Sequence, residues 1–328
     1  MSVTTVTMGP LLLLHDRGLL GESEVACDFG SMEFDSWGPA GNPVFEALFR
    51  TRGLDVPQTF YDRETARMYG TAGDYWRALG WEHTSYDIDG RFGSVVCDLN
   101  VDELPASEHG KYTLTMNGGT GEHVFNQYNF FRQVHNVTKV GGLMFHIVPF
   151  HLAQFHGFFQ YSPVLFHSLA QYNGYDVLGL WQVGKPLYAE YRPAHARPQG
   201  RRVNMIALMR RLREEEFVVP LQVNEPMVLN REAEARYGTF VQQATESLRP
   251  SEGLPETFYL DVATGSVHEG PLPKKLRAAL EGDGKQRPAK APAAKAAREK
   301  APATRRRRSL RGTVRRLVRS RPAEHRKV

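Results

Sequence analysis

Cysteine is scarce in this chain of 328 residues, which contains only Cys27 and Cys97. Each of the two lies in a short apolar run that is typical of a buried strand. A disulfide-stapled domain uses cysteine far more densely, and such domains belong to oxidising compartments. The scarcity excludes a disulfide scaffold and predicts a reduced, cytoplasmic protein.

Long apolar runs are also missing. Residues 11–14 are four consecutive leucines, a run too short to span a membrane, and neither a basic segment nor a small-residue cleavage site flanks it. We interpret the run as part of an amphipathic helix that precedes the first strand.

Acidic residues are nearly absent from the C-terminal end. Residues 285–328 hold 17 Lys or Arg and two acids, a net charge of +15, whereas residues 1–284 hold 24 basic and 34 acidic residues. Because apolar side chains are few from residue 283 onward, we predict a disordered basic tail over residues 283–328.

The predicted tail contains a narrow apolar stripe among its arginines, at Leu310, Val314, Leu317 and Val318. A segment of this kind can become helical on an anionic surface, so an anionic membrane or another polyanion is a candidate partner of residues 285–328. The protein would then be cytoplasmic with a peripheral attachment to the membrane. A purely solubilising extension is the alternative.

The body of the chain alternates short apolar runs with longer segments of helical period, which predicts an α/β fold. We expect a doubly wound, mostly parallel, seven-stranded sheet, with residues 200–222 forming an antiparallel hairpin at one edge. The predicted helices span residues 71–79, 123–139 and 163–172. The predicted strands span residues 25–29, 84–88, 94–99, 112–116, 143–148, 175–181, 203–209 and 217–221.

Three regions follow from these patterns. Residues 1–229 contain all the predicted strands of the α/β domain, and residues 230–282 form a predicted C-terminal helical extension. Residues 283–328, where the composition changes to Lys, Arg, Ala and Pro, are the basic tail.

Glycine is sparse at the end of the first predicted strand. The stretch "ACDFGSMEFD", residues 26–35, carries a single glycine, Gly30. A pyrophosphate-binding loop needs several glycines and a helix N-terminus that points at the ligand, whereas a nucleoside without phosphates needs only a tight turn and polar groups. The single glycine argues against a dinucleotide and for a nucleoside site, to which Asp28, Gly30 and Ser31 would contribute.

Polar side chains end the next three predicted strands as well. Asp87 and Asp89 in "SYDIDG" close the second, where either can accept hydrogen bonds from both ribose hydroxyls, and Asp98 in "VVCDLN" closes the third, where it would face an adenine amino group. Asn117 lies at the glycine-rich exit of the fourth. Ligands of doubly wound sheets bind beyond the carboxyl ends of the strands, so these residues predict one cofactor site. For Asp28 and Asp98, capping of local backbone amides is the alternative.

Together the motifs resemble those of the class I S-adenosylmethionine-dependent methyltransferases over residues 25–222. "DFG" is similar to the acidic-x-Gly motif of that family, and "YDID" to its acidic second strand end. "GEHV" (121–124) and "VTKVGG" (137–142) resemble segments around its fourth and fifth strands, and "HGFFQYSPVLF" (156–166) resembles a segment of a bacterial subgroup. The resemblance implies a Rossmann-like methyltransferase fold that binds S-adenosyl-L-methionine through the strand-end residues.

The chain departs from the family pattern in two places. Residues 32–34 replace the small residues that are usual in the glycine-rich loop, and 59 positions separate Asp28 from Asp87, where about 20 would be ordinary. We therefore expect residues 36–70 to be an insertion that forms a lid. A second interpretation follows from the reduced loop, namely a binding or regulatory protein of methyltransferase fold that has lost catalysis.

The resemblance implies transfer of a methyl group to an oxygen or nitrogen of a small metabolite or glycan-like acceptor. Such an in-line displacement depends mainly on alignment, and a hydroxyl acceptor also needs a base. His151 and His156 follow the fifth predicted strand, and a neutral imidazole suits that task.

Two further classes of site are not expected. The five-residue steps between His146, His151 and His156 fit neither a helical face nor alternate strand positions, so we interpret these residues as solvated loop histidines rather than a metal site. The exit of the fourth strand lacks the Asn or Asp, Pro-Pro, aromatic tetrapeptide that base-modifying relatives use around a flipped base. A specific nucleic-acid partner is therefore not expected.

Overall fold

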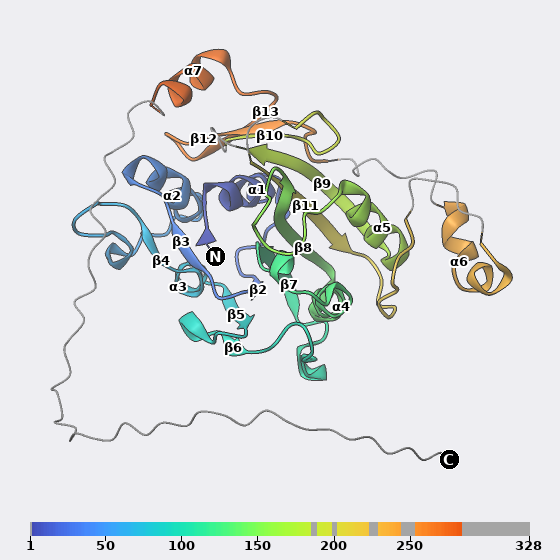
Figure 1. Cartoon of the computed structure of the whole chain (residues 1–328). Coiled ribbons are helices and arrows are strands. Elements are labelled where there is room, and N and C mark those ends of the chain that lie inside the picture. The colour runs from blue at the N-terminus through green and yellow to red at the C-terminus, as the bar shows by residue number, and fades with distance from the viewer. Residues whose placement is uncertain (1, 185–188, 199–201, 223–228, 244–252, 284–328) are drawn as a thin grey trace, which may run out of the picture. The chain divides into compact units, whose positions relative to one another are not determined.

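We describe a computed structural model of the chain, which covers residues 2–184, 189–198, 202–222, 229–243 and 253–283 (Figure 1). Residues 1–286 form one compact unit. The predicted tail beyond residue 283 lies outside the described residues, so its disorder and its partners remain predictions. Among the described helices, none is both long enough and apolar enough to cross a membrane.

A ten-stranded sheet forms the centre of this unit, where seven strands were predicted (Figure 1). Its order is β13-β12-β10-β9-β11-β8-β7-β2-β5-β6. In chain order the strands are β2 (Val25–Phe29), β5 (Glu82–Asp87), β6 (Val95–Val96), β7 (Tyr112–Gly118), β8 (Thr138–His151), β9 (Tyr175–Gly184), β10 (Glu190–Pro193), β11 (Val203–Arg211), β12 (Phe258–Asp261) and β13 (Ser266–Glu269).

The expected antiparallel hairpin at one edge of the sheet is wrong. β11 is a single strand that lies between β8 and β9 and is antiparallel to both. The second half of the predicted hairpin, residues 217–221, forms no strand. The edges are instead β6 on one side and the antiparallel β10, β12 and β13 on the other.

The parallel part of the sheet contains a topological switch point. β2 pairs in parallel with both β5 and β7, while β6 continues the sheet beyond β5 and β8 continues it beyond β7. Along the chain, β5 and β6 are therefore added on one side of β2, and β7 and β8 are then added on its other side. Ligands of doubly wound sheets bind outside the carboxyl ends of the strands at such a point.

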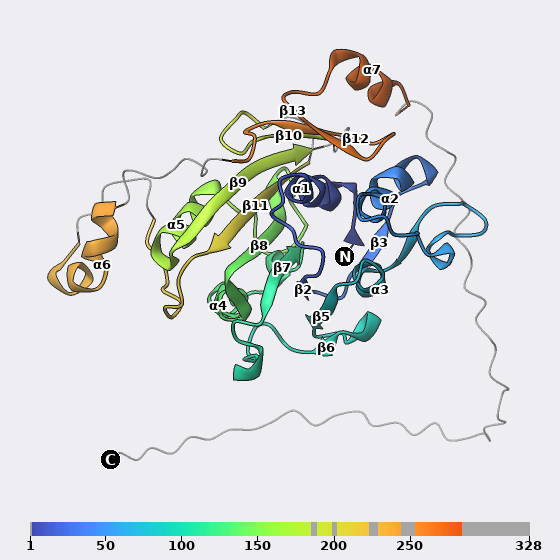
Figure 2. The same ribbon diagram turned by 180° about the vertical axis from the view of Figure 1, so that it is seen from behind.

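Helices cover both faces of the sheet, because successive residues of the central strands point to opposite sides. On β11, Ile206 and Leu208 belong to one apolar core, which they share with α1, α2 and α3, and Ala207 belongs to the second core, with α4 and α5. Figure 2 shows the same arrangement from behind. The helices are α1 (Thr5–Asp16), α2 (Asn42–Thr51), α3 (Ala72–Ala78), α4 (Gln127–Val137) and α5 (Pro163–Asn173).

The helix predicted around residues 11–14 exists, but it is not amphipathic. All residues from Thr5 to Leu14 in α1 are buried, because α2 and the sheet surround the helix. Thr4 caps its N-terminus, because the Thr4 side chain accepts a hydrogen bond from the Val6 amide and the Thr4 amide donates one to the Thr7 hydroxyl. A helix that is apolar all round belongs in a core.

The insertion at residues 36–70, which we expected to form a lid, contains α2, and this helix packs into the core. Phe45 and Phe49 of α2 are fully buried, and both rings contact Tyr75 of α3. The insertion also leads into a small second sheet of order β1-β3-β4, formed by β1 (Ser2–Val3), β3 (Glu33–Asp35) and β4 (Tyr69–Thr71). These aromatic contacts anchor α2 to α3.

The region after residue 230 contributes more than helices. Along the chain, α6 (Arg231–Gln243) precedes the hairpin of β12 and β13, and α7 (Lys274–Asp283) follows it. β12 pairs with β10 of the main sheet. The side chain of Trp181 in β9 also donates a hydrogen bond to the Pro255 carbonyl. The division at residue 230 remains a prediction of the sequence.

Candidate functional site

A cavity of about 180 Å³ lies at the carboxyl end of the sheet, beside the switch point. Gly118 and Gly119 at the end of β7 form part of its wall, together with Ile147 to Pro149 of the adjacent strand β8. The N-terminal segment closes another side. The remaining lining residues are Ser2, Thr4, Val6, Thr7, Trp37, Glu122, His156, Arg202 and Asn204.

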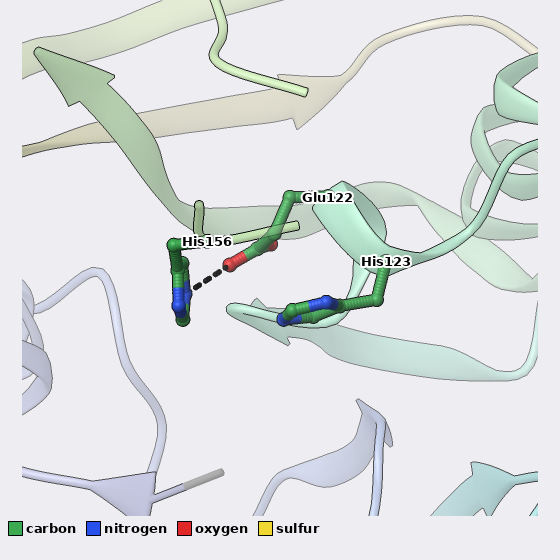
Figure 3. A group of neighbouring side chains, drawn as sticks. All are labelled: Glu122, His123 and His156. Carbon is green, nitrogen blue, oxygen red and sulfur yellow. Dashed lines mark ion pairs between the residues drawn. The ribbon is translucent and has the colours of Figure 1, made fainter. Parts of the chain in front are cut away.

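Glu122 and His156 meet at this cavity (Figure 3). The Glu122 Oε1 atom lies 3.4 Å from His156 Nε2, and the ring of His123 lies edge-on to the ring of His156 with centroids 5.1 Å apart. Glu122 is 1% exposed, whereas the His156 side chain is 39% exposed. A buried carboxylate thus faces two imidazoles that reach solvent.

The loop after β8 brings His156 to Glu122. The Phe158 amide donates a hydrogen bond to the Glu122 carbonyl at 2.7 Å. Leu152, Phe155 and Gly157 in this loop have φ values of 52°, 65° and 76°. Positive φ in two non-glycine residues stores backbone strain, which persists where surrounding contacts enforce it and often at functional sites.

Burial sets the protonation of this cluster. Burial raises the pKa of Glu122 from its ordinary value to about 7, since a carboxylate loses its hydration there, and Arg202 opposes the shift. Burial likewise lowers the pKa of His156, helped by the charges of Arg202 and His123. The pKa of His123 is also lowered by burial. Both shifts favour the neutral imidazole, which has a lone pair on one ring nitrogen.

The predicted cofactor residues at the ends of β2 and β5 are brought together. The Ser31 amide donates to Asp87 Oδ2 at 2.7 Å, and the Ser31 hydroxyl donates to Asp89 Oδ1 at 2.5 Å. Gly30 has φ 123°, a conformation that suits glycine, and its amide donates to the Tyr86 carbonyl. These hydrogen bonds connect the turn after β2 to the end of β5, as a binding site formed by both segments requires.

Asp28 takes a different position. Its side chain is 1% exposed and points into the core, where Oδ2 lies 2.9 Å from His83 Nε2 and 3.3 Å from Trp76 Nε1. Strand side chains alternate between faces, and this position of β2 faces α3 rather than the crevice. The carboxylate is therefore engaged in a buried structural pair.

The side chain of Asp98 forms hydrogen bonds within the turn that follows it. Oδ1 accepts hydrogen bonds from the Asn100 amide and the Asn100 side chain, each at 3.0 Å, and the Asp98 amide donates to Asp102. The capping alternative from the sequence describes these contacts. Asn117 is similarly occupied, because its Oδ1 accepts from the amides of Thr120 and Gly121.

The three histidines grouped by the sequence lie in different surroundings. His146 is not a solvated loop residue, as it lies within β8 and is 1% exposed, with Nδ1 3.3 Å from the Asn117 side-chain nitrogen. Burial lowers its pKa to about 3. His151 ends β8 and is exposed, and it does not line the cavity. Only His156 reaches the cavity.

One contact narrows the space at the switch point. Met32, which follows the β2 turn, is 4% exposed, and a Cβ added to Gly118 would lie 2.9 Å from the Met32 sulfur. The Met32 side chain therefore packs on the backbone at the end of β7. A methionine side chain is flexible and can move to admit another group.

The sequence analysis assigns no role to several residues of this site. Glu122 and His123 enter only as part of the "GEHV" motif, and Trp37 and Arg202 are not singled out. The motifs "GEHV" and "HGFFQYSPVLF" contained the signal, because each places a titratable side chain beside a glycine at a predicted strand exit. The sequence did not indicate that these two segments contact each other.

Comparisons with known proteins give a distant match. No protein-family model matches the chain, and no curated protein matches it in sequence. Among 23 solved chains that match it, one is described as the crystal structure of trans-methyltransferase CalH in complex with SAH, with 14% identity and a TM-score of 0.32. The match covers 63% of this chain and 57% of that chain, so this chain spans little more than half of its length. A likeness this distant carries no conclusion about activity.

Proposed function

We propose that the protein is an S-adenosylmethionine-dependent methyltransferase that acts on an oxygen or nitrogen of a small metabolite or glycan-like acceptor. The observation that carries the proposal is the switch point between β2 and β7, with a cavity beside it at the carboxyl end of the sheet. The order β6-β5-β2-β7-β8-β11-β9, with one antiparallel strand, also accords with the fold that the sequence motifs imply.

The residues at the switch point suit a nucleoside. Gly30 lets the chain turn tightly, and Ser31 holds Asp87 and Asp89 in place beside the turn. A carboxylate has about four lone-pair sites, so Asp87 keeps acceptor capacity for the two hydroxyls of a ribose. When bound, S-adenosylmethionine supplies a methyl group on a positively charged sulfur.

The cavity would hold the acceptor. At about 180 Å³ it is smaller than the roughly 300–1,000 Å³ of ordinary ligand pockets, so it fits a single reactive group rather than a whole substrate. His156 is the sequence candidate that lines it, and its imidazole is placed to receive an acceptor proton. His151 would act only if its segment moved, since it lies outside the lining. Arg202 favours an acceptor that carries negative charge.

A second candidate function is a binding or regulatory protein that has lost catalysis. The contact of Met32 with Gly118 favours it, because the side chain occupies space at the end of β7. The engagement of Asp28 with His83 favours it too, since the first strand end then offers no carboxylate to a ligand.

Titration calorimetry with S-adenosylhomocysteine tests the proposal. We expect micromolar binding, about −8 kcal/mol, that is largely lost in Asp87→Ala. Asp98→Ala is the matched control, because its carboxylate serves the turn at Asn100 and its loss should leave the affinity within about threefold. Well-folded protein that releases no heat would contradict the methyltransferase proposal and support the second candidate.

A further inference from the structure

We propose that Glu122, His123 and His156 bind a divalent metal ion of the zinc type. Each residue offers one ligand atom, and these three atoms lie within 4.8 Å of one another (Figure 3). The cluster adjoins the cavity of the proposed function, but the inference itself does not depend on binding of S-adenosylmethionine. It also goes beyond the sequence analysis, which groups His156 with His146 and His151 and expects no metal.

The ligand set has the chemistry of zinc sites. Two imidazole nitrogens and one carboxylate oxygen are the protein ligands of many catalytic zinc ions, which keep a further position open. With metal–ligand distances near 2.0–2.1 Å, tetrahedral geometry puts neighbouring ligand atoms about 3.4 Å apart. Glu122 Oε1 and His156 Nε2 are already separated by 3.4 Å. His123 is exposed, so its side chain is free to close the remaining gap.

A second and independent observation points to a cation. The Oε2 atom of Glu122 is buried and has no hydrogen-bond partner among the described residues. Burying a carboxylate oxygen without a partner is unfavourable, and buried charges are ordinarily paired or coordinate metals. The unpartnered oxygen lies on the same carboxylate that contacts His156. A bound cation would remove this deficit.

The backbone holds two of the ligands in place. The hydrogen bond from the Phe158 amide to the Glu122 carbonyl joins the two segments directly after His156. Gly157 allows the approach, because a Cβ at this position would lie 2.8 Å from that carbonyl oxygen. A site whose ligands are fixed by neighbouring backbone contacts binds metal with less reorganisation.

The metal would act on the acceptor, a step that rests on the proposed function. Glu122 and His156 line the cavity, so an ion between them has its open position there. An acceptor hydroxyl that coordinates the ion would have its pKa lowered and would release its proton to solvent water, leaving the oxygen lone pair for attack. The lone pair of His156 would then coordinate the ion rather than take the proton.

Direct metal titration of the full-length, metal-free protein tests the inference. We expect one equivalent of Zn²⁺ to bind by calorimetry and Co²⁺ to give the visible absorption of a low-coordinate nitrogen and oxygen site. Mg²⁺ should not compete, because it prefers oxygen ligands in octahedral geometry. Each of Glu122→Gln, His123→Ala and His156→Ala should weaken Zn²⁺ binding by more than about 100-fold, beyond the 10- to 100-fold typical of residues that only support a ligand.

His151→Ala provides the matched control, since His151 is an exposed histidine near the same loop that does not belong to the cluster. Its Zn²⁺ affinity should equal that of the unmodified protein. The inference is overturned if the unmodified protein binds no Zn²⁺, or if His123→Ala and His156→Ala bind it as well as His151→Ala does. Titration with S-adenosylhomocysteine is a separate measurement. Binding of Zn²⁺ without binding of S-adenosylhomocysteine would refute the methyltransferase proposal but not the metal site.

Discussion

Gly157 lies directly against Glu122. A Cβ at Gly157 would come within 2.8 Å of both the Cγ atom and the carbonyl oxygen of Glu122, and Gly157 has φ 76°. The next amide, that of Phe158, donates to the same carbonyl. This contact joins the segment after β7 to the loop after β8, and it places His156 beside the buried carboxylate.

Replacement of Gly157 by Ala should therefore open the site. The added methyl group meets both strain from positive φ and a collision with Glu122, so we expect a loss of about 2–3 kcal/mol in the free energy of unfolding. Gly53→Ala is the matched control, as Gly53 has φ 63° but nothing within 4 Å of its Cβ position. Urea denaturation of both variants gives the comparison. Equal losses would mean that the contact with Glu122 contributes nothing.

Asp28→Ala should reduce stability without affecting nucleoside binding. The substitution leaves the buried nitrogens of His83 and Trp76 without their acceptor, which costs about 1.5–3 kcal/mol for a hydrogen bond to a charged group. Denaturation and calorimetry with S-adenosylhomocysteine are measured on the same preparation. Unchanged stability together with lost binding would instead assign Asp28 to the cofactor site.

The stability of the protein should fall as the pH falls below about 6.5, in part because of His135. Its Nε2 atom lies 2.8 Å from the Glu215 carbonyl, an acceptor only, so Nε2 carries the proton and Nδ1 accepts from the Tyr175 hydroxyl. Burial and the charge of Arg211 lower the pKa of His135 to about 4. The unfolded chain then binds the extra proton first, so stability is lost as pH falls from about 6.5 to 4, by about 1.4 kcal/mol per pH unit.

Urea denaturation between pH 7 and pH 4.5 checks this dependence. The His135→Gln variant lacks the titrating group, so its free energy of unfolding should change less steeply with pH than that of the unmodified protein. The two slopes should differ by the contribution of one proton, about 1.4 kcal/mol per pH unit. Identical slopes would show that His135 is not held neutral in the folded protein. Because both proteins contain the same carboxylates, the contribution of these groups to the pH dependence cancels when the two slopes are compared.

Removal of residues 287–328 should abolish binding to anionic vesicles. Most of the 17 basic residues beyond residue 284 lie in this segment, which follows the compact unit of residues 1–286 in the sequence. We expect full-length protein to cosediment with vesicles that contain phosphatidylserine, and the binding to weaken steeply between low and physiological salt. The thermal transition of the shortened protein should be unchanged. A lower transition temperature would show that the segment packs on the core.

Much of the sheet could be predicted from the sequence. The apolar run at residues 25–29 matches β2 residue for residue, and the starts of β7, β9 and β11 are also as predicted. These segments are short, apolar and bounded by polar or glycine residues, so local pattern defines them. Strand ends were less well predicted, as β8 extends from Thr138 to His151 where residues 143–148 were expected.

What the sequence determined alone was local: which segments are buried, which strands end in polar residues, and where the positive charge lies. Tertiary structure decided how those segments combine. Asp28 and Asp87 lie on neighbouring strands, yet Asp28 contacts His83 in the core and Asp87 accepts a hydrogen bond from Ser31. Asp28 is paired opposite Ser85 inside the ladder, whereas Asp87 lies beyond the last residue pair of β2 and β5, where the turn after β2 reaches it. Glu122 and His156 are 34 positions apart and meet only because the sheet sets β7 beside β8 and a backbone hydrogen bond joins their exits. Contacts between residues so distant in sequence depend on the whole fold, and no local pattern contains them.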